Sequence, residues 1–230
     1  MIVDRIARLT VLALTRGKPA DVLRRLLGLE AFLRVKLDQA AIAYDGGVHA
    51  KHRLTGYHEF FVERVGADER VLDVGCGKAE LALDLAERSA ARVTGLDLNE
   101  KYLEYARRSP HPRLELVHGD AHAFSSETPF DTVVLSNVLE HIDDRPGLLR
   151  GLAERTGASR FLIRVPLLER DWTIPLRREL GLEWLSDATH FTEYTVPQFK
   201  EELAAAGLEP VEIHLRWSEI WAEACLAETR

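Results

Sequence analysis

The strongest structural signal in this chain lies in Glu69-Arg70-Val71-Leu72-Asp73-Val74-Gly75-Cys76-Gly77-Lys78-Ala79-Glu80. An apolar run ends in Asp-x-Gly-x-Gly and passes into apolar residues at helical spacing, Leu81, Leu83 and Leu85. Glycines at such a strand-to-helix turn let the backbone approach a ligand, because no Cβ atom stands in the way. The next apolar run, 93–96, ends in Asp97. An acidic residue about 20 positions after the glycines can reach the ribose hydroxyls of a nucleoside, so the stretch predicts a nucleoside cofactor site.

The rest of the chain alternates between strand and helix patterns. Apolar or β-branched runs predict strands at 70–74, 92–96, 113–117, 131–135, 160–165, 210–216 and 219–225. Helical patterns at 78–89, 99–108 and 145–156 lie between the first five strands, with a looser connection at 119–129. This alternation predicts an α/β fold, a Rossmann-like, seven-stranded, mainly parallel sheet with helices on both faces. The last run, 219–225, is expected to pair at a sheet edge or at a dimer contact.

In a sheet of this kind, ligands bind outside the carboxyl ends of the strands. The pattern therefore places the segment 73–77, Asp97, Asp120 and Asn137 on one rim of the sheet. Thr195 and Gln198 fit a capping box, which predicts that a helix begins there.

Two domains are predicted. Residues 1–45 are expected to form a helical cap, and residues 46–230 are expected to form the main domain, with a lid-like insertion at 166–196. Apolar residues at helical spacing indicate two amphipathic helices joined around Gly17-Lys18-Pro19, with a break near Gly28. Residues 1–40 carry eight Lys or Arg against four Asp or Glu, whereas the whole chain has a net charge of −7. The segment is interpreted either as a cap packed on the main domain or as a basic amphipathic surface for membranes or an acidic partner.

Composition narrows the class of protein. A net charge of −7 over 230 residues argues against a general polyanion binder. The two cysteines, Cys76 and Cys225, have no spacing typical of a zinc site or a disulfide framework, and they predict the reducing cytoplasm. No apolar run approaches the roughly 20 residues of a membrane-spanning helix, so stable membrane insertion is not expected.

The glycine loop discriminates between nucleoside cofactors. A dinucleotide fingerprint needs a third glycine three residues after Gly77, where this chain has Glu80. A carboxylate there would repel a pyrophosphate, and no Gly-Lys-Ser/Thr phosphate loop follows. A nicotinamide-dependent oxidoreductase is therefore the weaker alternative, and the chain also lacks the Tyr-x-x-x-Lys motif of such enzymes.

The pattern Asp-x-Gly-x-Gly-x-Ala at 73–79, followed by Asp97, resembles motif I and its partner acid in class I S-adenosylmethionine-dependent methyltransferases. The segment His118-Gly119-Asp120-Ala121 is similar to the family's segment whose acid contacts the adenine amino group. Residues 130–142 resemble its fourth strand and the following turn. The resemblance covers roughly residues 53–226 and is greatest to the small-molecule branch, including ubiquinone-type and natural-product methyltransferases. The family usually has a third glycine where this chain has Ala79.

The resemblance implies that S-adenosylmethionine is the cofactor and S-adenosylhomocysteine the product. It implies a set of cofactor-binding residues: Asp73, Gly75, Gly77, Asp97, Leu98, Asp120, Ala121 and Asn137. The polar segment 46–58, just before the first strand, is a candidate for the acceptor pocket, and its Arg53 or Tyr57 is expected to reach the cofactor's carboxylate. Two of the cofactor-binding residues have structural alternatives. Asp73 could orient the loop by accepting backbone N–H bonds, and Asp120 could cap a helix.

Methyl transfer is an in-line displacement at carbon, which an enzyme accelerates chiefly by positioning the reactants. A general base helps only where the acceptor is a hydroxyl that must lose a proton. His190, in a loop after the fifth strand, and His141, in the run Leu139-Glu140-His141-Ile142, are the candidate catalytic residues. Packing is the alternative role for His141.

The acceptor is expected to be a small molecule, methylated on oxygen, nitrogen or carbon. Methyltransferases acting on nucleic-acid amino groups carry Asn/Asp-Pro-Pro-aromatic after the fourth strand, where this chain has Ser136-Asn137-Val138-Leu139. The aromatic residues of the lid-like segment suit a flat or apolar acceptor. No nucleic acid and no metal are expected, and the chain is expected to be a monomer or homodimer. A non-catalytic, regulatory S-adenosylmethionine-binding protein is the other alternative.

Overall fold

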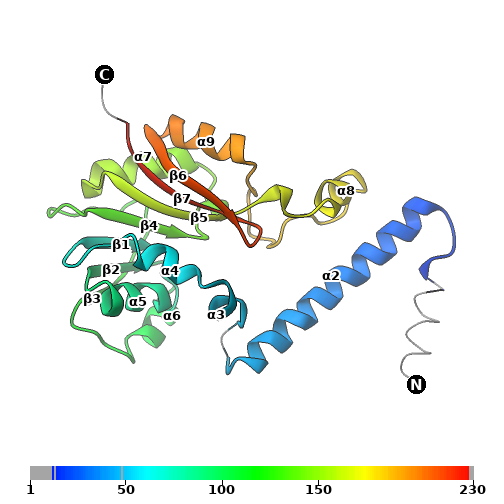
Figure 1. The fold of residues 1–230 in the computed structure, drawn as a ribbon, viewed down its shortest axis with the longest axis horizontal. Helices are drawn as coiled ribbons and strands as arrows, with labels where there is room; N and C mark the ends of the chain where they lie inside the picture. The colour runs from blue at the N-terminus through cyan, green and yellow to red at the C-terminus, as the bar shows by residue number, and fades with distance from the viewer. Residues whose placement is uncertain (1–11, 13, 48, 228–230) are drawn as a thin grey trace. The chain divides into compact units, whose positions relative to one another are not determined.

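The computed structural model describes residues 12, 14–47 and 49–227, and its chain divides into two compact units. One unit comprises Met1–Thr55 together with Asp171–Trp184, and the other comprises Gly56–Arg170 together with Leu185–Arg230. The second unit is built on a sheet of seven strands (Figure 1).

The strands lie within two residues of the positions that the sequence predicts. They are β1 Arg70–Val74, β2 Arg92–Asp97, β3 Leu114–His118, β4 Thr132–Ser136, β5 Arg160–Pro166, β6 Leu208–Arg216 and β7 Glu219–Leu226. Their order in the sheet is β3-β2-β1-β4-β5-β7-β6. Strands β1 to β5 pair in parallel, and β7 is antiparallel to both of its neighbours. The predicted α/β fold is confirmed, and the chain reverses its direction of strand addition beside β1, where ligands bind in such sheets.

Strand β7 corrects one expectation. It lies between β5 and β6, so β6, not β7, occupies the edge of the sheet. Ile220, Trp221, Ala222 and Ala224 are all buried, so both faces of the strand are covered. The alternation that suggested an exposed edge arose from Glu219 and Glu223, whose carboxylates form ion pairs with Arg164 and Arg160 of β5.

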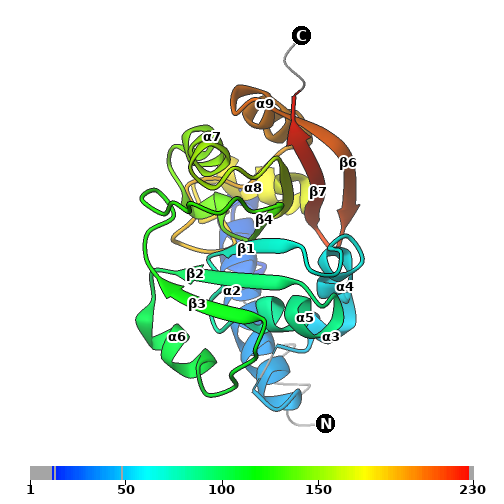
Figure 2. The same cartoon turned by 90° about the vertical axis from the view of Figure 1, so that its left-hand side faces the viewer.

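Helices cover both faces of the sheet, as Figures 1 and 2 show. On one face lie α4 Tyr57–Val62, α5 Glu80–Arg88 and α6 Glu100–Ala106, and on the other lie α7 Arg145–Thr156 and α9 Val196–Ala205. Two short 3-10 helices, η1 Leu139–His141 and η2 Leu168–Arg170, follow β4 and β5. The predicted capping box begins α9, because Thr195 Oγ1 accepts the Gln198 N–H at 3.2 Å.

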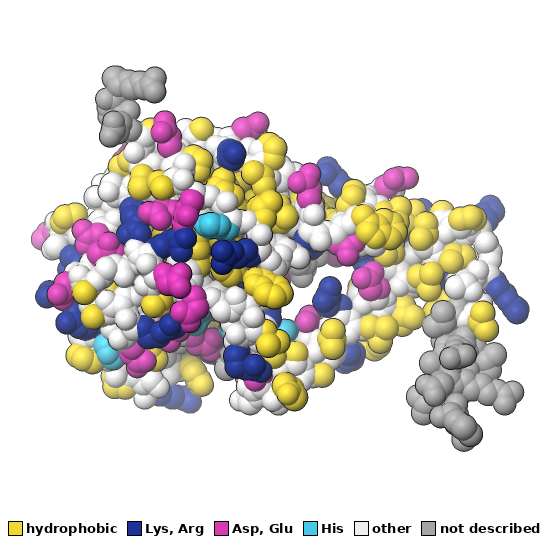
Figure 3. Space-filling view, in the orientation of Figure 1, with side chains coloured by type: hydrophobic (Ala, Val, Ile, Leu, Met, Phe, Trp, Pro, Cys, Tyr) yellow, Lys and Arg dark blue, Asp and Glu magenta, His cyan; other side chains and the backbone are white. Residues whose placement is uncertain are grey.

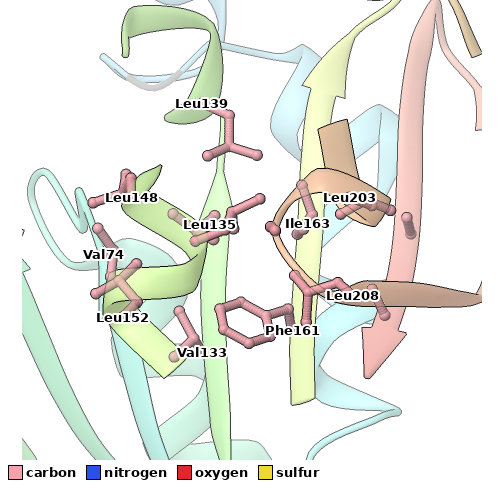
Figure 4. Close-up of a cluster of buried hydrophobic side chains, with 14 of the residues drawn as sticks. Val74, Val133, Leu135, Leu139, Leu148, Leu152, Phe161, Ile163, Leu203 and Leu208 are labelled. Atoms are coloured by element: carbon pink, nitrogen blue, oxygen red, sulfur yellow. The ribbon is translucent and has the colours of Figure 1, made fainter. Parts of the chain in front are cut away.

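The core beneath α7 and α9 fixes the carboxyl ends of β4 and β5. Leu135 of β4 and Phe161 and Ile163 of β5 are fully buried against Leu152 of α7 and Leu203 of α9 (Figure 4). Truncating such a leucine to alanine typically costs about 2–5 kcal/mol. The loops that follow these strands are therefore held on a rigid support.

The other unit contains α2 Pro19–Tyr44, α3 Lys51–Thr55 and α8 Thr173–Glu179. Arg177 of α8 donates to the Leu27 carbonyl at 2.9 Å and pairs with Glu30 at 3.0 Å, and Leu27 is buried. Residues 171–184 of the long connection after β5 thus belong with the N-terminal helix. The first of the two helices predicted from the sequence falls mostly on residues 1–11 and 13, outside the described residues.

The break predicted near Gly28 is wrong, because α2 runs without interruption from Pro19 to Tyr44. A glycine in a helix interior costs about 1 kcal/mol relative to alanine, which a long run of good helix formers can offset. A Cβ atom at Gly28 would meet nothing within 4 Å, so close packing does not require the glycine either.

Hydrophobic side chains lie on the surface of α2 (Figure 3). Phe32, Leu33, Val35 and Leu37 are each more than half exposed. The C-terminal half of this helix therefore carries exposed apolar side chains, which are often used for interactions.

In the part of the chain that the structure describes, none of the helices combines the length and the hydropathy needed to cross a bilayer.

Candidate active site

The glycine turn after β1 is held against two neighbouring segments. The N–H groups of Gly75 and Cys76 both donate to the Leu96 carbonyl of β2, at 2.7 and 3.1 Å. Gly75 has φ +67°, and a Cβ atom there would lie 2.7 Å from Cγ2 of Val138, after β4. Both the backbone conformation and the close approach therefore require glycine. At Gly77, with φ +57°, a Cβ would meet nothing within 4 Å, so that position opens onto free space.

Ala79 is a left-handed residue at the start of α5, with φ +60°. Glycine would adopt this conformation freely, whereas alanine pays roughly 1–2 kcal/mol for it. The structure thus explains why the resembling family places glycine here. Ala79 is also buried, so its methyl group contributes packing that partly offsets the strain.

Asp97 joins the loops that follow β1 and β2. Its Oδ2 accepts the Gly77 N–H at 2.7 Å, and its Oδ1 accepts the Asn99 N–H at 2.7 Å. A carboxylate can accept about four hydrogen bonds, so each oxygen keeps capacity for one more donor. The half-buried carboxylate can therefore hold the loop and still accept bonds from ribose hydroxyls.

Asp73, the last but one residue of β1, is buried at 2% exposure. Burial, with a smaller contribution from the charge of Asp97, raises the pKa of Asp73 to about 8. Its Oδ2 has no hydrogen-bond partner among the described residues. An unsatisfied buried carboxyl costs free energy, so this oxygen fits a donor group supplied by a ligand.

Asn137, the residue after β4, also has a buried side-chain oxygen that needs a hydrogen-bond donor. Its N–H donates to the Arg164 carbonyl at 2.8 Å, and its φ of +57° is a conformation that asparagine tolerates. Its side-chain Oδ1 is buried and, within the described chain, has no partner. Asp73 and Asn137 thus offer two orphaned oxygens at the ends of the adjacent strands β1 and β4.

The predicted adenine side of the site lies at the ends of β2 and β3. Leu98 is 68% exposed, which leaves an apolar surface directly after Asp97. Asp120 is exposed, and its Oδ1 accepts the His122 N–H at 2.8 Å. It therefore holds a turn, since no helix begins at this point in the structure. Ala121, the next residue, is half-buried and accepts a bond from Arg155 through its carbonyl at 3.0 Å.

The two residues expected to reach the cofactor's carboxylate lie in different units. Arg53 pairs with Asp45 at 2.9 Å in the unit of the N-terminal helix. Tyr57 is buried in the other unit, where the Arg164 guanidinium lies 3.9 Å from its ring centre. Burial raises the pKa of Tyr57 to about 12, so the phenol stays protonated at neutral pH. The role of both residues in cofactor binding remains a prediction.

Arg164 is a site residue that the sequence analysis missed. It is 5% exposed in β5, where it forms a bidentate ion pair with Glu219 at 2.7 and 3.0 Å and donates to Ser136 Oγ at 3.2 Å. A single arginine within the apolar run 161–165 was the available signal, because a buried charge needs a partner.

His141 and His190, separated by 49 positions in the chain, lie in contact. Their ring centres are 4.6 Å apart in an edge-to-face arrangement, and Thr189 Oγ1 lies 2.9 Å from His141 Nδ1. Burial, with the neighbouring His190, lowers the pKa of His141. The structure therefore brings the two predicted catalytic residues together, beside the residues that follow β4.

Glu140 adds a carboxyl group that the sequence analysis did not select. It is 1% exposed, and burial raises its pKa to about 7. A carboxyl oxygen of Glu140 and one ring nitrogen each of His141 and His190 all lie within 4.8 Å of one another. Groups this close can share a proton or a divalent cation, and the roles predicted for His141 and His190 concern the proton. An acid in the apolar run 138–142 was the signal for Glu140.

The chain is similar in sequence to O-methyltransferases of ubiquinone biosynthesis. The ubiquinone biosynthesis O-methyltransferase of Azoarcus sp. is 30% identical over 160 residues, which are 64% of this chain and 67% of the relative. The mitochondrial ubiquinone biosynthesis O-methyltransferase of Schizosaccharomyces pombe is 32% identical over 124 residues, 49% of this chain. The chain spans about two thirds of the Azoarcus protein and 45% of the Schizosaccharomyces protein.

Solved structures share the fold. The TehB-like S-adenosylmethionine-dependent methyltransferase of Corynebacterium glutamicum superposes with a TM-score of 0.58 at 18% identity, covering 87% of this chain and 100% of that one. The glycopeptide N-methyltransferase MtfA, solved with S-adenosylmethionine, gives a TM-score of 0.56 at 22% identity, covering 75% and 87%. The model of a methyltransferase-domain family matches residues 47–213. The chain therefore belongs to the class I S-adenosylmethionine-dependent methyltransferases.

Proposed function

We propose that this protein transfers a methyl group from S-adenosylmethionine to a hydroxyl group of a small-molecule acceptor. The observation that carries the proposal is the continuity between the cofactor rim and the histidine pair. Asn137, whose buried amide oxygen has no partner among the described residues, lies only three residues before Glu140. Glu140 and His141 both belong to η1, which begins two residues after Asn137. A base placed there can act beside a cofactor held on the same rim.

The residues of the rim fit the cofactor. Its sulfonium and amino groups are cationic or donating, and the orphaned oxygens of Asp73 and Asn137 are acceptors. Asp97 has remaining acceptor capacity for ribose hydroxyls, and exposed Leu98 offers an apolar contact for a flat base. Gly77, with open space around it, lets the loop backbone pass close to the ligand. When bound, S-adenosylmethionine supplies an electrophilic methyl group.

The chain's own task is then to position the acceptor and to take its proton. A hydroxyl is a poor nucleophile until it loses its proton, and a positioned base typically contributes about 10²–10⁴-fold. His190 lies on the route from β5 to α9, its side chain is 8% exposed, and its ring contacts His141. We assign His190 as the general base and His141 as the ring that packs against it.

Hydroxyl acceptors are favoured over amines for two reasons. The relatives with about 30% identity are named O-methyltransferases. A neutral amine needs no base before it attacks, so a histidine pair beside a buried carboxyl would have no task in amine methylation. A small molecule is favoured over a nucleic acid, because the net charge is −7 and the residues after β4 are Asn137-Val138-Leu139.

The proposed compartment is the cytoplasm, which is supported by the two free cysteines, Cys76 and Cys225. The proposed assembly is a monomer or homodimer. Gel filtration with light scattering would distinguish these two states.

The proposal is tested by methyl transfer to a panel of small acceptors. The purified chain is incubated with methyl-labelled S-adenosylmethionine and with phenols, catechols, amines and carbon acids, one at a time. We expect label in hydroxyl acceptors, and a loss of roughly 10²–10⁴-fold in His190→Asn. His122→Asn, an exposed histidine on the β3 side, is the matched control and should keep the wild-type rate. Transfer to amines alone, with His190→Asn unaffected, would refute the proposal. Saturable cofactor binding without transfer to any acceptor would favour a regulatory binding protein.

A further inference from the structure

The segment that carries His190 is fixed at both ends. The Phe191 N–H donates to the Glu140 carbonyl at 2.8 Å, which ties the segment to η1. The Tyr194 N–H donates to the Pro166 carbonyl at 3.0 Å, and Leu168 donates back to the Tyr194 carbonyl at 2.7 Å. These bonds anchor residues 191–194 to η1 and to the end of β5. The backbone positions of His190 and Glu193 relative to each other are therefore fixed.

Glu193 is a fully buried carboxylate beside His190. Its side chain has no exposed surface, and its Oε1 lies 3.5 Å from His190 Nδ1. It also accepts the Ser186 N–H at 2.5 Å and pairs with Arg170. Burial alone would raise the pKa of Glu193, but its interactions with His190, Ser186 and Arg170 outweigh burial and lower the pKa to about 2. The carboxylate therefore keeps its charge at every physiological pH.

His190 Nδ1 is buried and, in the described chain, makes no hydrogen bond within normal limits. The nearest acceptor is Glu193 Oε1, and 3.5 Å exceeds a normal N–H···O distance by a few tenths of an ångström. Bonds between catalytic groups are often long in a protein without its ligands and shorten when the complex forms. His190 also contacts the His141 ring, and one of its ring nitrogens lies within 4.8 Å of a carboxyl oxygen of Glu140.

From this geometry we infer that Glu193 is a positioning residue that holds the His190 proton on Nδ1 and leaves Nε2 free to accept the proton of the acceptor hydroxyl. The inference rests on the proposed function, since it gives His190 its role as base. In the step itself, the O–H bond of the acceptor breaks and an N–H bond forms at Nε2. The imidazolium then carries a positive charge that the buried carboxylate stabilises. A fixed carboxylate that orients a histidine in this way acts through tautomer and charge, without touching the substrate.

The alternative role for Glu193 is purely structural, as the partner of Arg170. The chain contains a matched control for that role. Glu202 of α9 forms a bidentate ion pair with Arg145 at 2.7 and 2.8 Å and has no histidine among the donors to its carboxylate. Glu202→Gln therefore removes an arginine–carboxylate pair while leaving Arg170, Ser186 and His190 beside Glu193 in place.

The test is nitrogen NMR of the full chain labelled with ¹⁵N-histidine, with His190→Asn used to assign the His190 signals. In the wild type we expect His190 in a single neutral tautomer, with a pyrrole-type Nδ1 and a pyridine-type Nε2. Glu193→Gln should lose this preference and give a mixture, whereas Glu202→Gln should retain it. A wild-type His190 protonated on Nε2 would overturn the inference, whether or not Glu193→Gln folds.

Binding and rate measurements separate this inference from the proposed function. S-adenosylhomocysteine should bind to Glu193→Gln within about twofold of the wild-type affinity, while kcat for a hydroxyl acceptor falls on the order of 10- to 10³-fold. Glu193→Asp should recover part of the loss. An unchanged kcat, or a loss confined to KM, would overturn the positioning role. Failure of the wild type to methylate any hydroxyl would instead overturn the proposed function, whichever tautomer His190 adopts.

Discussion

The Gly77 N–H donates to Asp97 Oδ2 at 2.7 Å, which links the glycine turn after β1 to the acid at the end of β2. The second oxygen of Asp97 accepts the Asn99 N–H at the same distance. The two parts of the motif, twenty positions apart in the chain, are therefore one structural unit. A change at Asp97 should affect both the shape of the loop and any hydroxyl that binds there.

Replacing Asp97 by alanine should weaken binding of S-adenosylhomocysteine by about 100-fold, equivalent to about 3 kcal/mol. The variant loses the ribose acceptor and releases the Gly77 and Asn99 N–H groups. The measurement is titration calorimetry. Asp131→Ala is the control, because Asp131 also accepts a backbone N–H, that of Arg70 at 2.8 Å, but at the opposite end of the strands. Equal losses of affinity in both variants would show that the effect is general destabilisation.

The two glycines of the turn should respond differently to alanine. Gly75→Ala meets both a left-handed backbone and the Val138 side chain at 2.7 Å, whereas Gly77→Ala meets only the backbone strain. We expect the free energy of unfolding to fall by about 1–2 kcal/mol for Gly77→Ala and by roughly 1–3 kcal/mol more for Gly75→Ala. Urea denaturation measures both.

Val138→Ala in the Gly75→Ala background isolates the clash, because it removes the methyl group that the new Cβ would meet. The double variant should recover the extra loss and approach Gly77→Ala. If Gly75→Ala is no less stable than Gly77→Ala, the close approach of the two loops is not present in solution.

Cofactor binding should release a proton from Asp73. Its pKa is raised to about 8, so at pH 7 the carboxyl is mostly protonated in the folded protein. A cationic ligand beside it favours the ionised form, so affinity for S-adenosylmethionine should rise by up to about tenfold per pH unit between pH 6 and 8. Calorimetry in buffers of different ionisation enthalpy counts the proton, and Asp73→Asn should abolish its release. Proton uptake on binding would contradict the assignment.

The raised pKa of Asp73 also makes the free energy of unfolding depend on pH. Unfolded aspartate ionises near pH 4, whereas Asp73 keeps its proton in the folded protein up to about pH 8. The folded state thus binds more protons across this window, and the free energy of unfolding attributable to Asp73 falls as pH rises from about 4 to 8. In Asp73→Asn this contribution to the slope should be missing.

Gly28→Ala should stabilise α2 by about 0.5–1 kcal/mol, because alanine has the higher helix propensity and the new Cβ has room. Thermal unfolding followed by circular dichroism measures the change. Gly147→Ala in α7 is the opposite case, since its Cβ would clash with the Asp144 carboxylate that caps the helix. A loss of stability in Gly28→Ala would indicate that the glycine is needed for a contact.

The positions of the strands and the residues at the rim were predictable because each depends on local sequence. The run 69–80 predicts a strand, a glycine turn and a helix from hydrophobicity and from residues that permit positive φ. Ends of parallel strands then meet at one rim for geometric reasons, which groups Asp73, Asp97 and Asn137. Asp97 and the turn were found for this reason.

What the sequence did not predict depends on contacts between distant segments. The pairing of Glu193 with His190 and Arg170 arises in the loop 185–194, where apolar residues such as Phe191 stand among polar ones without helical or strand periodicity. No pattern therefore distinguishes the buried carboxylate. Strand β7 was placed at the edge because alternation cannot show that its glutamates pair with arginines of β5. The break expected at Gly28 was wrong because helix propagation in its neighbours outweighs one glycine.

Titration of the purified chain with S-adenosylhomocysteine, with NAD and NADP as comparison ligands, shows whether the glycine turn after β1 binds the methyltransferase cofactor or a dinucleotide. We expect saturable binding of S-adenosylhomocysteine in the micromolar range or tighter, binding to Asp97→Ala that is about 100-fold weaker, and no binding of NAD or NADP. Binding of NAD without binding of S-adenosylhomocysteine would contradict this expectation, because Glu80 and Ala79 would then have failed to exclude a dinucleotide from the glycine turn.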